Sequence, residues 1–569
     1  MAEPPSIPFR TTGSRLLHPL SILFNVPLDQ VNFAVCQSFA LFAAFWFRLY
    51  LSPSRAGAIV RHVVITMIGI YFAIFCFGWY SLHIFIEVSL CYCIMITASV
   101  SNIHRYSFVA AMGYLTLCQI SRVYIFNYGL LATDFSGPLM IVTQKITSLA
   151  FQIHDGLGRK DEELTTEQRR LAVSARPTLL EYCSYHLNFL GILAGPTSSY
   201  KDYIAFIEGN HIDMKLIEEH WKQKGFSKFP DPSPLPSAIL ARTRELPHST
   251  CPHLYRSLLA QRRMAVVVGN QSSQFLDIAV VVLQDSDLGR IIFSSFINDH
   301  HKRAVANKML ITFICLVWFT VITKNFPISY NVDDKFISEA SFFRKLCYLF
   351  ISVHASRPKY YFAWTLADAI NNAAGFGFSG LDKNGNLRWN LISNLNIWNI
   401  ETATSFKMCL DSWNIQTGAW LKSVCYDRAP YFPTALTFIL SALWHGVYPG
   451  YYFTFTTAIL ITLAARAMRS NFRHYFLSSR MIKVGYDIAT WASTQLALCY
   501  IVTPFLLLAT EPTIKFYKSM YFHFHILCAL VLPILAVKKQ KSVTQIDPTF
   551  LKAKSSNPAP NCQQPKKEQ

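Results

Sequence analysis

Charged side chains are scarce in this chain and make up only 15% of its 569 residues. A typical soluble domain carries about 25% charged residues, whereas 52% of this sequence is hydrophobic. The composition therefore excludes an ordinary soluble domain and predicts a membrane protein. Acidic residues are the scarcer charged class, with 33 against 52 basic residues. Because the basic residues lie in loops between apolar runs, we assign the surplus to membrane topology and to the lipid bilayer, and we expect no nucleic acid partner.

Metal-binding and disulfide patterns are also absent from the sequence. The 14 cysteines lie mostly inside apolar runs, Cys91 and Cys93 form the closest pair, and no CxxC repeat or Cys/His ligand spacing occurs. We therefore expect no metal site, no disulfide framework and no permanently bound cofactor. The two-fold internal hydropathy symmetry of many transporters is missing as well. A polytopic transporter nevertheless stays open as the alternative from another class of protein, because it too would use intramembrane polar residues.

Apolar runs of about 20 residues, the length that crosses a bilayer, recur along the chain. They fall at 31–50, 57–79, 81–98, 106–127, 307–323, 342–356, 431–447, 449–465, 485–508 and 515–537. The runs at 136–153 and 178–195 are weaker, and we expect these to be short, tilted or interfacial. The sequence thus predicts an all-α polytopic membrane protein with about ten or eleven transmembrane helices. The oligomeric state stays open.

Changes in polarity along the chain divide it into five parts. They are a polar N-terminal segment (1–30), membrane helices and loops (31–235), an insertion (236–306), a second membrane core (307–540) and a polar tail (541–569). The insertion lacks a full span, and a loop longer than about 12–15 residues is usually either functional or disordered. We expect it to be disordered, with a folded accessory module as the alternative.

The distribution of basic residues predicts the orientation in the membrane. The segment 466–483 contains five basic residues and no acidic one, and residues 538–541 include three lysines. Both stretches are expected on the cytosolic side. The last four residues carry lysines at the third and fourth positions from the end, a pattern of endoplasmic-reticulum retrieval. We therefore expect an endoplasmic-reticulum membrane protein with a cytosolic C-terminus and no cleaved signal peptide.

A histidine near the end of an uncharged apolar run is the most informative single residue. The segment Trp444-His445-Gly446 lies just before Pro449, Gly450 and Tyr451. An ionisable side chain within a membrane span is costly and is a functional candidate by default. A neutral imidazole is a competent general base near neutral pH. The alternative is a structural histidine that makes an interhelical hydrogen bond.

Two further patterns precede this histidine. The first contains Arg357, Lys359, Tyr360, Tyr361 and Trp364 and continues to Asn372, Gly375 and Gly377. Its basic residues are candidates to meet phosphates, and its amides Asn371 and Asn372 lie in an apolar stretch and need hydrogen-bond partners. The alternative is a basic helix end followed by small residues that pack closely. The second is Trp413-Asn414, whose amide offers both donors and an acceptor. Taken alone, Asn414 favours a structural amide over a catalytic one.

Together the three patterns resemble the membrane-bound O-acyltransferase family, and within it the lysophospholipid branch. The segment from Trp444 through Gly450 and Tyr451 to Phe455 is similar to that family's histidine box. The residues from Arg357 to Trp364 are similar to a second box, and Asn414 aligns with the family's catalytic asparagine. The resemblance covers about residues 10–235 and 307–540, and the insertion is its one departure.

The resemblance implies a fold that encloses an intramembrane tunnel, and an acyltransferase activity. His445 would be the general base and Asn414 its catalytic partner. Acyl-CoA, with oleoyl-CoA preferred, would be the co-substrate, and lysophosphatidylethanolamine and lysophosphatidylserine the acceptors. The residues implied in substrate binding are Arg357, Lys359, Tyr360, Tyr361, Trp364, Asn372, Trp413, Trp444, Gly450 and Tyr451. A different acceptor, such as another lysophospholipid, a sterol, a diacylglycerol or a protein, is the alternative within the family.

Overall fold

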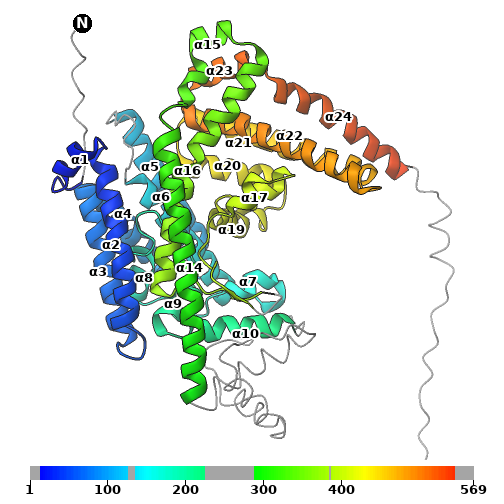
Figure 1. The fold of residues 1–569 in the computed structure, drawn as a ribbon. Helices are drawn as coiled ribbons and strands as arrows, with labels where there is room; N and C mark the ends of the chain where they lie inside the picture. The colour runs from blue at the N-terminus through cyan, green and yellow to red at the C-terminus, as the bar shows by residue number, and fades with distance from the viewer. Residues whose placement is uncertain (1–12, 126–134, 224–286, 383–385, 545–569) are drawn as a thin grey trace, which may run out of the picture.

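The protein is built almost entirely of helices. The computed structural model describes residues 13–125, 135–223, 287–382 and 386–544 (Figure 1). A two-stranded antiparallel hairpin, β1 (Gly380–Leu381) with β2 (Leu387–Arg388), is a small exception to the predicted all-α fold.

The helices of the N-terminal half pack side by side (Figure 1). The longer ones are α2 (Leu28–Tyr50), α3 (Ala58–Phe77), α4 (Leu82–Thr97), α5 (Ile103–Ile120) and α6 (Ser136–Gly158). The shorter ones are α1 (His18–Phe24), α7 (Thr166–Leu171), α8 (Leu179–Leu187), α9 (Tyr200–Glu208) and α10 (His211–Gln223).

The second half also contains long helices. They are α14 (Asp287–Ile322), α16 (Phe342–Ala374), α21 (Pro449–Phe472), α22 (Arg480–Leu507) and α24 (His523–Thr544). Shorter helices between them are α15 (Asp334–Glu339), α17 (Ile397–Glu401), α18 (Phe406–Leu410), α19 (Ile415–Leu421), α20 (Pro433–His445) and α23 (Thr510–Ser519). A π-helical turn, η5 (Lys422–Tyr426), follows α19 directly.

Four described helical segments are long and apolar enough to cross a membrane. They are Leu28–Tyr50, Ala58–Thr97, His300–Ile322 and Arg480–Leu507. A fifth is the pair α23 and α24 up to Leu535, which bends by 72°, if it forms one span. The predicted runs at 57–79 and 81–98 are continuous in the structure through a 3₁₀ turn, Gly78–Ser81. The mostly helical fold and these candidate spans agree with the prediction of a helical membrane protein, and the larger number of helices stays a prediction.

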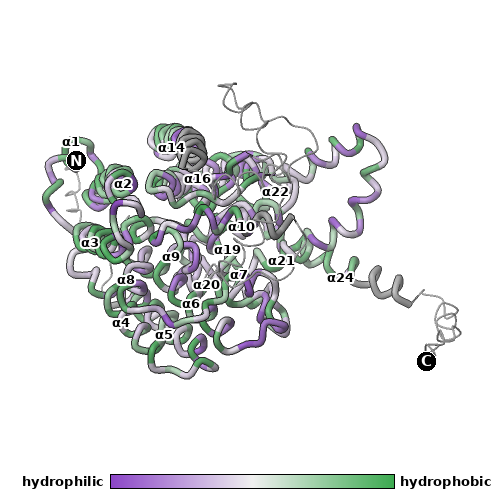
Figure 2. The backbone as a smooth tube through the Cα atoms, turned by 90° about the horizontal axis from the view of Figure 1, so that it is seen from below, coloured by the Kyte–Doolittle hydropathy of each residue, from purple (hydrophilic) through white to green (hydrophobic). Residues whose placement is uncertain are grey.

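Large apolar side chains lie on the outside of these segments. Phe42 is 71% exposed and Phe313 63% exposed, and Ile59 on α3 is exposed as well. In Figure 2 most residues of α3 have hydrophobic colours. Exposed apolar area of this kind is expected where helices face lipid rather than water.

Helices α14 and α16 pack against each other in antiparallel order. The imidazole of His301 bonds to the carbonyl of Asn372 at 2.6 Å, and Lys308 pairs with Asp368 at 2.8 Å. Farther along, the hydroxyl of Thr323 donates to the carbonyl of Ala355. The predicted insertion extends to 306, whereas in the structure α14 already begins at Asp287, and His301 within this stretch contacts α16. Residues 236–286 lie outside the described part of the chain.

Candidate active site

His445 is the last residue of α20, and the chain reverses immediately after it. Gly446 has φ 131°, a conformation that residues with a side chain rarely adopt. Pro449 then starts α21. A proline has no backbone N–H, but at the first position of a helix this group has no partner within the helix, so no hydrogen bond is lost. The sequence break predicted at Pro449 and Gly450 is thus a helix–turn–helix, and it places the imidazole at a helix end.

Gly450 allows α21 to approach the end of α22 closely. A Cβ atom at Gly450 would lie 2.2 Å from the carbonyl oxygen of Pro504. The backbone N–H of Gly450 donates to the carbonyl of Leu508 at 2.7 Å. The backbone of Gly450 therefore holds α21 close to α22, and a part of Gly450 in substrate binding stays a prediction.

Aromatic rings surround His445. Phe455 stacks on it at 5.4 Å between centroids, Phe505 meets it edge-on at 5.0 Å, and Tyr451 lies at 5.7 Å. Within the described residues the imidazole has ring contacts but no hydrogen bond. The structural alternative, an interhelical hydrogen bond, is therefore not seen there. Phe505 was not predicted, because it comes from α22 and no local motif marks it.

Asn414 precedes α19 in a left-handed conformation, with φ 49°. A short polar side chain tolerates this conformation better than most. Asn394 fixes the residue in place: its Nδ2 donates to Oδ1 of Asn414 at 2.9 Å, and its Oδ1 accepts from the N–H of Gln416. Since Asn394 uses the acceptor end of Asn414, the amide nitrogen is the end that points to other partners. Sequence reasoning missed Asn394, which is buried and lies 20 residues upstream.

The aromatic residues of the second box meet the tryptophan next to Asn414. The ring of Trp413 lies 5.7 Å from Tyr360, 6.0 Å from Tyr361 and 5.5 Å from Trp364. These residues come from α16 and from the segment before α19. The structure thus brings together two of the three predicted patterns.

Arg357 is engaged by protein groups. Its guanidinium pairs with Glu401 at 2.9 Å and donates to Gln495 at 3.1 Å. The hydroxyl of Tyr361 donates to the same carboxylate at 2.5 Å. These contacts join α16 to α17 and α22, and a phosphate contact by Arg357 stays a prediction. Lys359, in contrast, is exposed on α16.

Asn372 is fully buried at the end of α16. Its Nδ2 donates to the carbonyl of Trp389 at 3.3 Å. A Cβ atom at Gly377 would lie 1.5 Å from Oδ1 of Asn372, so this glycine makes room for the amide. Within the described residues these contacts are local packing, and none joins Asn372 to His445 or Asn414.

The helices that carry Asn414 and His445 touch through two tryptophans. The ring of Trp420 on α19 lies 5.7 Å from that of Trp444 on α20, and both side chains are buried. Trp444 therefore packs between helices. No contact among the described residues joins His445 to Asn414 directly. In the same part of the chain, no cluster of His, Cys, Asp or Glu could hold a metal ion.

Comparison with known proteins identifies the class of protein. A model of the MBOAT, membrane-bound O-acyltransferase, family matches residues 291–503. Membrane-bound glycerophospholipid O-acyltransferase 1 of Homo sapiens is 58% identical over 95% of this chain and 95% of its own. Membrane-bound glycerophospholipid O-acyltransferase 2 of Homo sapiens is 51% identical over 93% of this chain and 89% of its own. Lysophospholipid acyltransferase 6 of Drosophila melanogaster is 36% identical over 94% of this chain and 65% of its own.

The chain belongs to the membrane-bound O-acyltransferase family. It is an acyltransferase, which confirms the predicted enzyme class and replaces the transporter alternative. The family match begins at residue 291, inside α14.

Proposed function

We propose that this protein re-acylates lysophospholipids with a fatty acyl group taken from acyl-CoA, inside a tunnel within the membrane. The proposal rests on the surroundings of His445. The imidazole lies at a helix end among aromatic rings and makes no hydrogen bond to the described residues. A ring nitrogen is therefore available to a hydroxyl group of a bound substrate. The relatives' names, which specify glycerophospholipid and lysophospholipid acyltransferases, support this acceptor class.

In the proposed reaction His445 accepts the proton of the glycerol hydroxyl of the lysophospholipid. The oxygen attacks the thioester carbonyl carbon, so that a C–O bond forms and the carbonyl oxygen becomes an oxyanion. Collapse of this intermediate breaks the C–S bond, and the coenzyme A thiolate leaves with the proton held by His445. A positioned general base contributes about 10²–10⁴-fold to such a reaction.

Asn414 is the proposed donor to the developing oxyanion. Asn394 occupies its Oδ1 atom, so its Nδ2 end is the one oriented for donation. Loss of one such donor costs about 10²–10³-fold in turnover. The cluster of Trp413 with Tyr360 and Trp364 lies beside Asn414 and is proposed to contact the substrates.

We further propose that ethanolamine and serine lysophospholipids are the preferred acceptors and oleoyl-CoA the preferred donor, as the resemblance implies. We also propose that the protein lies in the endoplasmic-reticulum membrane with its C-terminus in the cytosol. The basic segment 466–483 and the lysine pair at 566–567 support this placement.

Microsomes that contain the protein test the proposal directly. They are offered lysophospholipids with choline, ethanolamine, serine and inositol headgroups, together with oleoyl-, palmitoyl- and arachidonoyl-CoA, and the products are identified by mass. Ethanolamine and serine products with an oleoyl chain are expected, and His445→Ala microsomes should form none. Equal rates with every headgroup would refute the acceptor preference, and turnover by His445→Ala would refute the base. Products formed only with a sterol or a diacylglycerol would refute the lysophospholipid acceptor.

A further inference from the structure

Helix α6 presents one continuous face to the segment that carries Asn414 and His445. Residues spaced by three or four positions lie on the same side of an α-helix. On α6 this face consists of Met140, Gln144, Thr147, Phe151 and Asp155. Most of α6 is buried, and each of these five residues contacts a group between Thr417 and Trp444.

The first turn of this face holds α20. The indole N–H of Trp444 donates to the carbonyl of Met140 at 3.0 Å. From α5, the amide of Gln119 donates to the carbonyl of Trp444 at 3.1 Å. The residue directly before His445 is thus held at its side chain and at its backbone.

The middle of the face holds α19. The Nε2 of Gln144 donates to the hydroxyl of Thr417 at 2.9 Å, and the indole N–H of Trp420 donates to the hydroxyl of Thr147 at 2.9 Å. All four side chains are buried. Because Thr417 is only three residues beyond Asn414, these bonds fix the start of α19 relative to α6.

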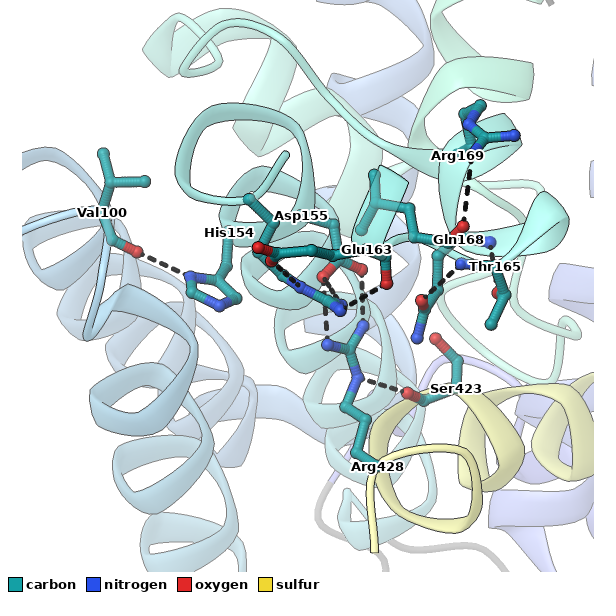
Figure 3. A network of polar contacts seen from close by, with 11 residues as sticks. Val100, His154, Asp155, Glu163, Thr165, Gln168, Arg169, Ser423 and Arg428 are labelled. Atoms are coloured by element: carbon teal, nitrogen blue, oxygen red, sulfur yellow. Dashed lines mark hydrogen bonds and ion pairs between the residues drawn. The ribbon is translucent and has the colours of Figure 1, made fainter. Parts of the chain in front are cut away.

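The last turns of the face hold the link between α19 and α20. Arg428, just after η5, donates to both carboxylate oxygens of Asp155, at 3.0 and 2.5 Å, and to the carbonyl of Ser423 (Figure 3). Its guanidinium also lies 4.6 Å from the ring centre of Phe151. Such a bidentate pair fixes both orientation and distance.

We propose that Gln144 and Thr147 are positioning residues for acyl transfer. They hold α19, and through it Asn414, in a fixed register with α20 and His445. This inference rests on the proposed function, because it concerns the spacing of the two residues assigned there. The two helices share one rigid support, so a shift of α19 on α6 changes the distance between the oxyanion donor and the base. A misplacement of about 1 Å can cost roughly 10²-fold in rate.

Thr147→Val tests the proposal, because it keeps the shape of the side chain and removes the acceptor for Trp420. We expect its kcat to fall about ten- to hundredfold, with KM for both substrates unchanged. Thr147→Ser restores the hydroxyl and should restore kcat. Gln144→Ala provides a second variant and should lower kcat in the same way. Trp420→Phe alone and Trp420→Phe combined with Thr147→Val should be equally slow. Each single substitution already removes the hydrogen bond between Trp420 and Thr147, so the second one has no bond left to remove.

Thr143→Val is the matched control on the same helix. The hydroxyl of Thr143 donates at 2.7 Å to Glu87 on α4, away from α19. This variant should lower the melting temperature while kcat per folded molecule, counted by size-exclusion chromatography, stays at the wild-type value. Equal kcat in Thr147→Val and the wild type would overturn the positioning role, and so would an equal loss of kcat in Thr143→Val.

The two proposals fail separately. If His445→Ala is inactive and Thr147→Val turns over normally, only the positioning role is wrong. If His445→Ala keeps turning over, the base assignment is wrong, and the comparison of Thr147→Val with Thr143→Val still decides the positioning of Asn414.

Discussion

The amide of Asn394 donates a hydrogen bond of 2.9 Å from its Nδ2 to Oδ1 of Asn414. The same residue accepts the N–H of Gln416 through its side chain and the N–H of Ile415 through its carbonyl. One buried residue therefore sets both the backbone turn before α19 and the direction of the Asn414 amide.

Asn394→Asp is expected to slow acyl transfer without removing the protein from the membrane. A carboxylate cannot donate to Oδ1 of Asn414, so the amide loses the contact that selects its orientation. A fall in kcat of about 10-fold or more is expected, since one oxyanion donor supplies about 10²–10³-fold. Steady-state rates with saturating acyl-CoA measure the effect. Asn390→Ala, at an exposed neighbouring amide, should turn over normally; equal rates for Asn394→Asp and the wild type would contradict the role of Asn394.

Three glycine-to-alanine variants should differ in activity and stability, because the three glycines differ in backbone conformation and in the space around them. Gly446→Ala places a side chain at φ 131° directly after His445, and strain of about 1–3 kcal/mol is expected to displace the imidazole and lower kcat. Gly450→Ala would bring a Cβ atom within 2.2 Å of the carbonyl of Pro504, so it should also lower the folded yield. Gly418→Ala meets nothing within 4 Å in the middle of α19 and should be neutral or slightly stabilising. Activity per folded molecule and thermal melting measure these effects, and an inactive Gly418→Ala would contradict the argument.

The pair Asp202 and Lys215 predicts a loss of stability in acid. Burial alone would raise the pKa of Asp202, but the ammonium of Lys215 at 2.6 Å and the nearby guanidinium of Arg170 hold this pKa below its ordinary value. A lowered pKa means that the stabilisation is complete above about pH 4, the unfolded value, and is lost as the pH falls through the folded value. The difference in melting temperature between the wild type and Asp202→Asn should therefore shrink below about pH 4. Asp161→Asn, at an exposed pair with Arg169, should show no such trend. If the difference in melting temperature between the wild type and Asp202→Asn does not change with pH, the proposed effect of Lys215 on Asp202 is wrong.

The sequence could predict the parts of the site that depend on neighbouring residues. Pro449 and Gly450 indicate a break after His445, and the helix end lies there. Asn394, Phe505 and the partner of Arg357 could not be found in this way. Each comes from a different helix or loop, and the helix packing that brings it to the site leaves no periodic signal.

The predicted end of the insertion differs from the start of α14 because of a local signal, the polarity of the residues. Residues 287–306 are more polar than the span that follows, and this polarity assigns them to the insertion when the sequence is read alone. In the structure, the polar side chains of His301 and Lys308 dock onto α16. The same polarity therefore marks a helix that extends beyond the apolar run.

The ion pair of Arg357 with Glu401 gives the last prediction. The side chain of Arg357 is only 9% exposed, and the carboxylate also accepts from Tyr361. Glu401→Ala leaves a buried guanidinium without its counter-charge, and because Glu401 is 35% exposed we expect a cost of about 1–3 kcal/mol, below that of a fully buried pair. Thermal melting in detergent should show a clear decrease, while Lys407→Ala, which breaks an exposed pair with Asp411, should show almost none. Since Arg357 is engaged by the protein, KM for acyl-CoA should be unchanged in the folded Glu401→Ala enzyme. A large change in KM with no change in melting would instead assign Arg357 to the substrate.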